Sequence, residues 1–264
     1  MRYACGIEYD GHGFLGFQKQ VQEPTIQNSL EVAISKVANH TIRLICSGRT
    51  DTGVSATSQV IHFDTNVQRT DYQWIMGVNT NLPSGISLLW IKEVSNDFHA
   101  RFSAIQRSYQ YKILNRWIRP ALNRHSVTWE KLPLDANKMH QAAQYLLGKH
   151  DFNAFRSSAC QSKTPIKTID AISVKRVDNT VILDVSASGF LHHMIRNIIG
   201  TLLPIGRGEK DVESMLKVLL SKDRTQAGVT ASPNGLSFNN VKYPKHFNLP
   251  EKAIDDHLPR HYGK

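Results

Sequence analysis

The chain has 264 residues, of which 41% are hydrophobic and 20% are charged. These proportions exclude an intrinsically disordered chain, and the length suffices for one large domain or two of ordinary size. Lysine and arginine total 32 against 22 acidic residues, which gives a formal net charge of +10. A basic surface of this size is consistent with a polyanionic partner such as a nucleic acid.

No run of about 18 apolar residues occurs, so the sequence predicts no membrane-spanning helix. The N-terminus lacks the charged, apolar and small-residue pattern of a signal peptide. Cys5, Cys46 and Cys160 are scattered and show no paired metal spacing. We therefore expect free thiols in a reducing, cytoplasmic environment.

The first 105 residues predict one mixed unit of strands and helices. Residues 2–9 alternate as a strand, and Thr25 is an N-cap for a helix with one apolar face. Further strands are predicted at 42–46, 59–64 and 86–94, and a short helix at 71–78. This β-α-β-β-α-β order is that of a ferredoxin-like or RNA-recognition-motif-like unit, which we assign as the first domain.

The same order returns from residue 106, which predicts a second such domain over 106–245. Its insertions fall at 115–133 and 149–165, and Gly148 stands where the first helix of this half should stop. We expect an α/β fold of two units whose antiparallel sheets meet over a shared cleft, and a tail over 246–264 whose residues 252–264 are disordered and solvated. The predicted strands are 108–114, 168–177, 180–186 and 236–241, and the predicted helices are 134–147, 190–205 and 211–221.

Gly11-His12-Gly13-Phe14-Leu15-Gly16 matches the G-x-G-x-x-G pattern of dinucleotide-binding sites, directly after a strand. Such a site needs the glycines to open a helix and an acidic residue about 20 positions later. Here the helix begins only after Pro24, and the next strand ends without an acidic residue. The sequence therefore predicts no nicotinamide or flavin cofactor.

The loop between the strands at 42–46 and 59–64 is too long for a tight hairpin, and long loops in compact domains are often functional. Gly48 and Gly53 frame Asp51, and Arg49 stands two residues before it. A carboxylate on a shaped loop can act as a nucleophile or a proton acceptor. Spacing alone favours ordinary turn hydrogen bonds, because aspartate is common in turns.

Gly48-Arg49-Thr50-Asp51-Thr52-Gly53-Val54 resembles the signature loop of the tRNA pseudouridine synthase A family. The family usually has a histidine where Ser55 stands. The resemblance covers residues 3 to 245 in order. Its other motifs are Tyr9 to Gln18 (with Phe17 in place of the usual tryptophan), Arg107-Ser108-Tyr109-Gln110-Tyr111, the insertion segments 151–156 and 160–165, and Gly235-Leu236.

The predicted helix at 190–205 is apolar nearly all round, apart from a polar stripe of His192, His193, Arg196 and Asn197. A buried arginine is costly unless a carboxylate pairs with it. The resemblance implies that Asp51 is that carboxylate. Adjacent histidines suggest a metal, but zinc on a helix requires i, i+4 spacing and a third ligand. We predict no metal site, and we expect these histidines to hydrogen-bond within the cleft or to contact RNA, with His193 as the substrate-binding residue of the two.

The resemblance also implies the roles of single residues. Asp51 is the catalytic residue, and Tyr109 packs on the target base and helps proton transfer. From the residues alone Tyr109 could equally be core, and Tyr111 lies on the same strand face as a second candidate. Leu236 lines the base pocket, and Arg49 enters the RNA stem where the base is displaced.

The family reaction converts uridine to pseudouridine at positions 38–40 of the tRNA anticodon stem-loop, without cofactor or metal, and the family enzymes are homodimers. A non-catalytic RNA-binding protein of two RNA-recognition-like units would explain the charge and the strand aromatics. It would not explain an aspartate between glycines that is paired with a buried arginine. A metal-dependent nuclease requires more clustered carboxylates than the sequence offers.

Overall fold

The computed structural model describes residues 1–21 and 24–250, so our prediction for the tail from residue 251 lies outside the described residues. In the N-terminal half, residues 1–105, the elements are β1 (Arg2–Tyr9), α1 (Ile26–Ala38), β2 (Leu44–Cys46), β3 (Ser55–Asp64), α2 (Asp71–Asn81) and β4 (Ile86–Val94). In the C-terminal half they are β5 (Gln106–Asn115), β6 (Thr128–Glu130), α3 (Ala136–Gln144), β7 (Gly148–Asp151), β8 (Ile166–Val177), β9 (Thr180–Ala187), α4 (Met194–Gly206), α5 (Ser214–Ser221) and β10 (Leu236–Lys242).

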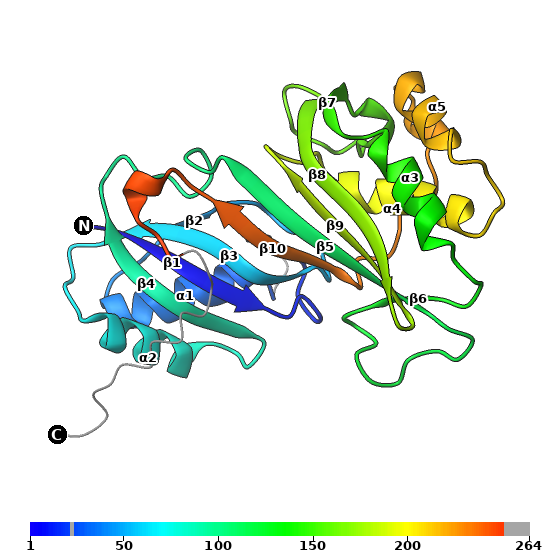
Figure 1. Ribbon diagram of the computed structural model, residues 1–264. Coiled ribbons are helices and arrows are strands. Elements are labelled where there is room, and N and C mark those ends of the chain that lie inside the picture. Colours follow the sequence, from blue (N-terminus) through cyan, green and yellow to red (C-terminus); the bar gives the residue numbers. More distant parts are fainter. Residues whose placement is uncertain (22–23, 251–264) are drawn as a thin grey trace.

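The strands form one continuous mixed sheet in the order β4-β1-β3-β10-β5-β9-β8-β7, with β2 beside β3 and β6 beside β5. The predicted α/β class is confirmed, but the two sheets that we expected to meet over a cleft are joined edge to edge. The join is β10, which pairs antiparallel with β5 and parallel with β3 (Figure 1). Because β10, the last strand of the described residues, returns to the boundary between the halves, it completes both.

Each half of the sheet has its own helices and its own core. Helices α1 and α2 cover the N-terminal half, whereas α3, α4 and α5 lie with the C-terminal half (Figure 1). The buried apolar side chains form two clusters, and Tyr109 packs against both of them. Thr25 caps α1 as predicted, because its hydroxyl accepts the backbone N–H of Asn28 at 3.3 Å.

Several element boundaries differ from the predictions for local reasons. Strand β6 and all but the first residue of β7 lie inside segments that we took as insertions, because strands of three and four residues carry no readable alternation. Gly148 opens β7 with φ of +90° and lies beyond the end of α3. Helix α4 begins four residues later than predicted, because His193 adopts a left-handed conformation with φ of 61°.

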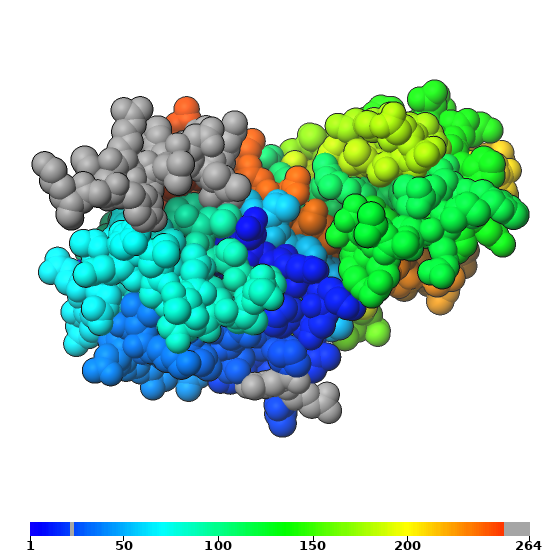
Figure 2. Space-filling view, turned by 90° about the horizontal axis from the view of Figure 1, so that it is seen from below, coloured from blue at the N-terminus to red at the C-terminus, as the bar shows by residue number. Residues whose placement is uncertain are grey.

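The two halves also touch away from the shared sheet. In the view from below, the dark blue N-terminal residues lie beside the green residues of the C-terminal half (Figure 2). His12 stacks on His125 there, with ring centroids 3.4 Å apart. Among the described residues, no helix has the length and apolar character needed to cross a membrane.

Candidate active site

Asp51 lies on the loop between β2 and β3, and hydrogen bonds to backbone carbonyls fix both sides of this loop. On one side the side-chain Nε2 of Gln59 donates to the Gly48 carbonyl at 2.7 Å. On the other side the N–H of Val54 donates to the carbonyl of Asp51 at 3.1 Å, and Gly53 closes the turn with φ of +78°. The carboxylate therefore stands on a rigid turn that only glycine adopts easily.

The glycine-rich segment after β1, residues 11–16, packs against this loop. Gly16 has φ of +89°, and a Cβ at that position would lie 2.9 Å from the carbonyl oxygen of Thr50. A Cβ on Gly11 would lie 2.3 Å from the carbonyl oxygen of Val54. The N–H of Phe17 donates to the Thr50 carbonyl at 3.0 Å. The G-x-G-x-x-G pattern therefore allows two backbones to pack closely around Asp51.

Arg196 from α4 meets the Asp51 carboxylate from the other half of the molecule. Its Nη1 lies 3.3 Å from Oδ2 of Asp51, and its Nε donates to the carbonyl of Ala231 at 2.7 Å. The two side chains are only 15% and 23% exposed, so each charge is shielded from water. The structure thus brings together the aspartate and the arginine that we expected to pair, 145 residues apart.

A close approach of two backbones brings Ala231 to Arg196. A Cβ on Gly200 would lie 1.8 Å from the carbonyl oxygen of Val229, so the segment before β10 packs directly on α4. The N–H of Ala231 also donates to the carbonyl of Arg196 at 3.1 Å. Only glycine at position 200 permits this contact, and the contact aims the guanidinium at Asp51.

Two histidines complete the surroundings of the carboxylate. Nε2 of His192 lies 3.3 Å from Oδ1 of Asp51, and Nε2 of His193 lies 3.4 Å from Oδ2. Burial lowers the pKa of His193, although the Asp51 charge acts in the opposite direction. We predicted that His193 contacts substrate and gave His192 no separate role, whereas in the structure both rings face Asp51.

Asp51, His192 and His193 offer three possible metal ligands whose donor atoms lie within 4.8 Å of one another. The sequence showed no third ligand beside the two histidines. The fold brings one to them, because Asp51 from the other half of the chain lies next to both rings. Two observations fit a metal poorly. Arg196 already places a cation on Oδ2, and Nδ1 of His192 is buried without a hydrogen-bond partner among the described residues. Metal-binding histidines usually hydrogen-bond through their second nitrogen.

Tyr109 lies on β5 beside the Asp51 loop. Its ring packs edge-on between Phe190 and Phe238, with centroid distances of 5.1 and 5.0 Å. Its hydroxyl lies 3.9 Å from the position that a Cβ on Gly48 would take. Burial first, and neighbouring groups including Asp51 second, raise the pKa of Tyr109 well above its usual value. The hydroxyl therefore stays protonated at neutral pH.

Tyr111 is not a second candidate for the base contact. It is fully buried, and its hydroxyl lies 2.6 Å from the hydroxyl of Thr128 and donates to the carbonyl of Ser232 at 2.8 Å. Alternation along the strand correctly places both tyrosines on one face. The segment before β10 covers Tyr111, so it belongs to the core.

The remaining predicted residues lie at different depths. Leu236 begins β10, is 7% exposed and packs in the C-terminal core opposite Tyr111. Arg49 is exposed and reaches Gln161 of the 149–165 insertion at 3.5 Å, so it does not contact Asp51. Ser55, where the family usually has histidine, accepts the N–H of Gly11 at 3.0 Å and so ties the loop to the glycine segment.

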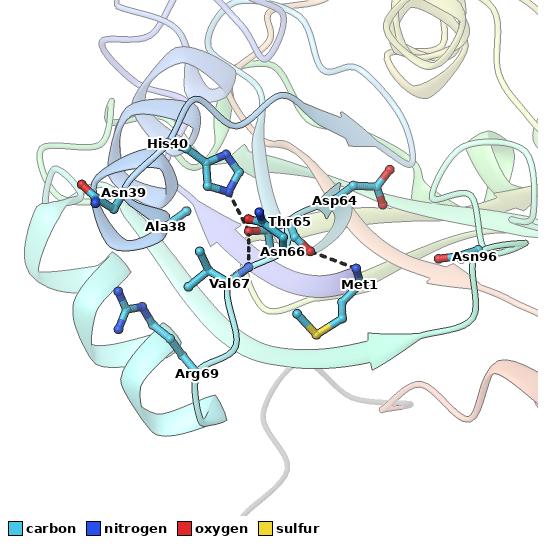
Figure 3. Close-up of a pocket in the computed structure, with 10 residues that line it drawn as sticks. All are labelled: Met1, Ala38, Asn39, His40, Asp64, Thr65, Asn66, Val67, Arg69 and Asn96. Atoms are coloured by element: carbon cyan, nitrogen blue, oxygen red, sulfur yellow. Dashed lines mark hydrogen bonds between the residues drawn. The ribbon is translucent and has the colours of Figure 1, made fainter.

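A separate surface hollow of about 860 Å³ lies at the start of β1 (Figure 3). It contains none of the predicted site residues. Some of its polar groups bond to one another: the Met1 amine donates to the Thr65 carbonyl at 2.9 Å, and His40 Nε2 lies 2.7 Å from the Thr65 hydroxyl.

Known proteins resemble this chain along most of its length. The family model described as tRNA pseudouridine synthase matches residues 6–103 and 142–244. The tRNA pseudouridine synthase A of Shewanella sp. (strain MR-4) is 51% identical over 96% of this chain and 97% of its own length. That of Colwellia psychrerythraea (strain 34H / ATCC BAA-681) is 49% identical over 96% and 98%.

A chain in the crystal structure of a Cbf5-Nop10-Gar1 complex aligns with 76% of this chain and 45% of its own length, at 13% identity and a TM-score of 0.36. That similarity is too low for a comparison of the two sites. The sequence matches are much stronger evidence of relationship, because they span nearly the whole of both chains. The chain therefore belongs to the tRNA pseudouridine synthase A family, and it is an isomerase that forms pseudouridine in tRNA.

Proposed function

We propose that Asp51 is the catalytic nucleophile and that the uridines it acts on are those at positions 38–40 of the tRNA anticodon stem-loop. The observation that carries the first part is the convergence of Arg196, His192 and His193 on this one carboxylate. The reaction breaks the N1–C1′ bond, forms a C5–C1′ bond, and moves a proton from C5 to N1. Atoms and electrons balance without an oxidant or a second substrate.

The neighbouring residues divide the remaining work. Arg196 orients Asp51 through an ion pair whose own position is fixed by Ala231. Tyr109, held between two phenylalanine rings, offers the aromatic contact for a base that has left its helix. Leu236 adds apolar surface beneath the base. Because Nε2 of His193 lies 3.4 Å from the Asp51 carboxylate, this histidine contacts the substrate only where the substrate meets Asp51.

The surface around this site supports an RNA substrate. The net charge of +10 favours a polyanion, and the exposed Arg49 can both stack and contact phosphate. We further propose that the enzyme is a homodimer that grips tRNA across both subunits. Trp117, Ile118 and Leu122 on the loop after β5 are 75%, 65% and 84% exposed, which is unusual for a surface that meets only water. Light scattering that gives the mass of a single chain would exclude the dimer.

The central test uses an unmodified tRNA transcript, EDTA in the buffer, and two aspartate variants. Asp51→Asn keeps the size of the side chain but removes the charge, so it should form no detectable pseudouridine and still bind tRNA. Asp178→Asn, in the exposed turn between β8 and β9, is the matched control and should act as wild type. Mapping pseudouridine along the product locates the modified positions. Turnover by Asp51→Asn would remove Asp51 from the mechanism, and product elsewhere would refute positions 38–40.

A further inference from the structure

Nitrogen atoms of basic side chains are unequally divided between the two oxygens of Asp51. Oδ2 lies 3.3 Å from Nη1 of Arg196, which donates a hydrogen bond to it, and 3.4 Å from Nε2 of His193, whereas Oδ1 meets only Nε2 of His192, at 3.3 Å. The oxygen with fewer such neighbours keeps more of its lone-pair density available. Oδ2 therefore anchors the carboxylate, and Oδ1 is the freer oxygen.

We infer that Oδ1 of Asp51 is the oxygen that reacts with the uridine, and that His192 is the positioning residue that aims it. This inference rests on the proposed role of Asp51 as nucleophile. Without His192 the carboxylate is held only through Oδ2, so rotation of the whole group about the Cβ–Cγ bond, which moves Oδ1, is less restricted. The consequence should fall on the chemical step, because His192 touches Asp51 and its loss leaves the exposed RNA-facing groups unchanged.

The surroundings of the His192 ring fix which nitrogen carries the proton. Nδ1 is buried and has no hydrogen-bond partner among the described residues. A proton on Nδ1 would be a buried donor with nothing to receive it, which proteins avoid. We therefore place the ring proton on Nε2, the nitrogen that lies 3.3 Å from Oδ1. His192 thus presents a proton-bearing nitrogen to the Oδ1 side of the carboxylate.

The backbone of His192 is held from outside the helix. Its carbonyl accepts the N–H of Ser157 at 3.1 Å, and its own N–H donates to Sγ of Cys160 at 3.4 Å. Both partners lie in the 149–165 insertion, so this insertion packs against His192 and is more than a solvated loop. It supports the backbone behind the ring that faces Asp51.

The backbone conformation of the next residue, His193, also indicates a functional site. His193 has φ of 61° and ψ of 5°, a left-handed conformation that non-glycine residues rarely adopt. This turn brings two consecutive imidazoles to one carboxylate, with ring centroids 4.0 Å apart. In regular helix or strand, consecutive side chains point in different directions. The unfavourable backbone angle thus lets each carboxylate oxygen have its own histidine.

The test compares single-turnover rates of tRNA modification, in EDTA, for wild type, His192→Leu and His192→Gln. Leucine cannot donate, whereas the glutamine amide can place an N–H close to the position of Nε2. We expect His192→Leu to slow the chemical step by about 10- to 100-fold, the range produced by a misplaced reacting group. We expect His192→Gln to stay within about five-fold of wild type, and the Kd for tRNA to stay within about two-fold in both.

The control is His246→Gln, an exposed histidine after β10 that lies outside the site. Melting curves establish that each variant is folded. A wild-type rate in His192→Leu, equal losses in the leucine and glutamine variants, or a loss that appears in the Kd would each overturn the role of His192. The two proposals fail separately: a fast His192→Leu with an inactive Asp51→Asn leaves the nucleophile intact, and an active Asp51→Asn removes it.

Discussion

His62 provides a quantitative prediction because it is a histidine buried in the sheet. It lies on β3, is 3% exposed, and its Nδ1 accepts the N–H of Ala100 at 3.1 Å. Burial first, then the charge of Arg2 and the neighbouring His99, lower the pKa of His62 to about 4. The folded protein therefore keeps this ring neutral well below the pH at which a free histidine takes up a proton.

The sign of the effect follows from the two pKa values. Above pH 6.5 neither the folded nor the unfolded state holds the proton, and His62 adds no pH dependence. Between about pH 6.5 and pH 4 the unfolded state takes up the proton first, so the folded state loses stability as the pH falls. The total loss is about 3 kcal/mol, of which about 1.4 kcal/mol is already lost at pH 5.5.

The assay compares thermal melting of wild type and His62→Asn at pH 7.5 and pH 5.5. Asparagine retains an acceptor for the Ala100 N–H but does not titrate. At about 2–4 °C per kcal/mol, the melting temperature of wild type should fall by about 3–6 °C more than that of the variant. His246→Asn, at an exposed site, should follow wild type. Equal pH dependence in wild type and His62→Asn would refute the assignment.

Two further predictions concern the contacts that aim Arg196. Arg196→Met should slow the single-turnover rate by about 100-fold with little change in tRNA binding, because the Asp51 carboxylate loses the ion pair that orients it and a misplaced reacting group costs about that much; a rate within three-fold of wild type would contradict this. Gly200→Ala should lower the melting temperature by several degrees, because its Cβ would lie 1.8 Å from the Val229 carbonyl oxygen. Gly189→Ala is the control, since a Cβ there meets nothing within 4 Å, and equal melting of the two variants would show that the segment simply yields.

The sequence predicted several regular elements from local signals. Alternation located β1 to the residue, the buried strand pattern located β4 to the residue, and the Thr25 cap placed the start of α1. The boundary error at α4 has a different origin. The left-handed conformation at position 193 is stable only because surrounding segments hold it. Two adjacent histidines in a sequence do not indicate such a conformation.

The candidate site was predictable in part, and by two different routes. The rule that a buried arginine needs a carboxylate predicted a partner for Arg196, but only the family resemblance identified Asp51. The contact of His192 with Oδ1 had no sequence signal, because it depends on a loop more than 140 residues away. Tyr111 shows the converse limit: alternation gave its face correctly but could not show which segment would cover it.

The continuous sheet explains how the two halves of the chain can hold the site residues in a fixed geometry. Asp51 comes from the first half and the three basic side chains that contact it come from the second, so any motion between the halves would separate them. The parallel pairing of β10 with β3 covers only Ser237 and Phe238, too few hydrogen bonds to hold the halves alone. Phe238 is also buried in the N-terminal core and packs on Tyr109, which borders both cores. The aromatic ring that we assign to the base therefore belongs to the joint that keeps Asp51 and Arg196 in register.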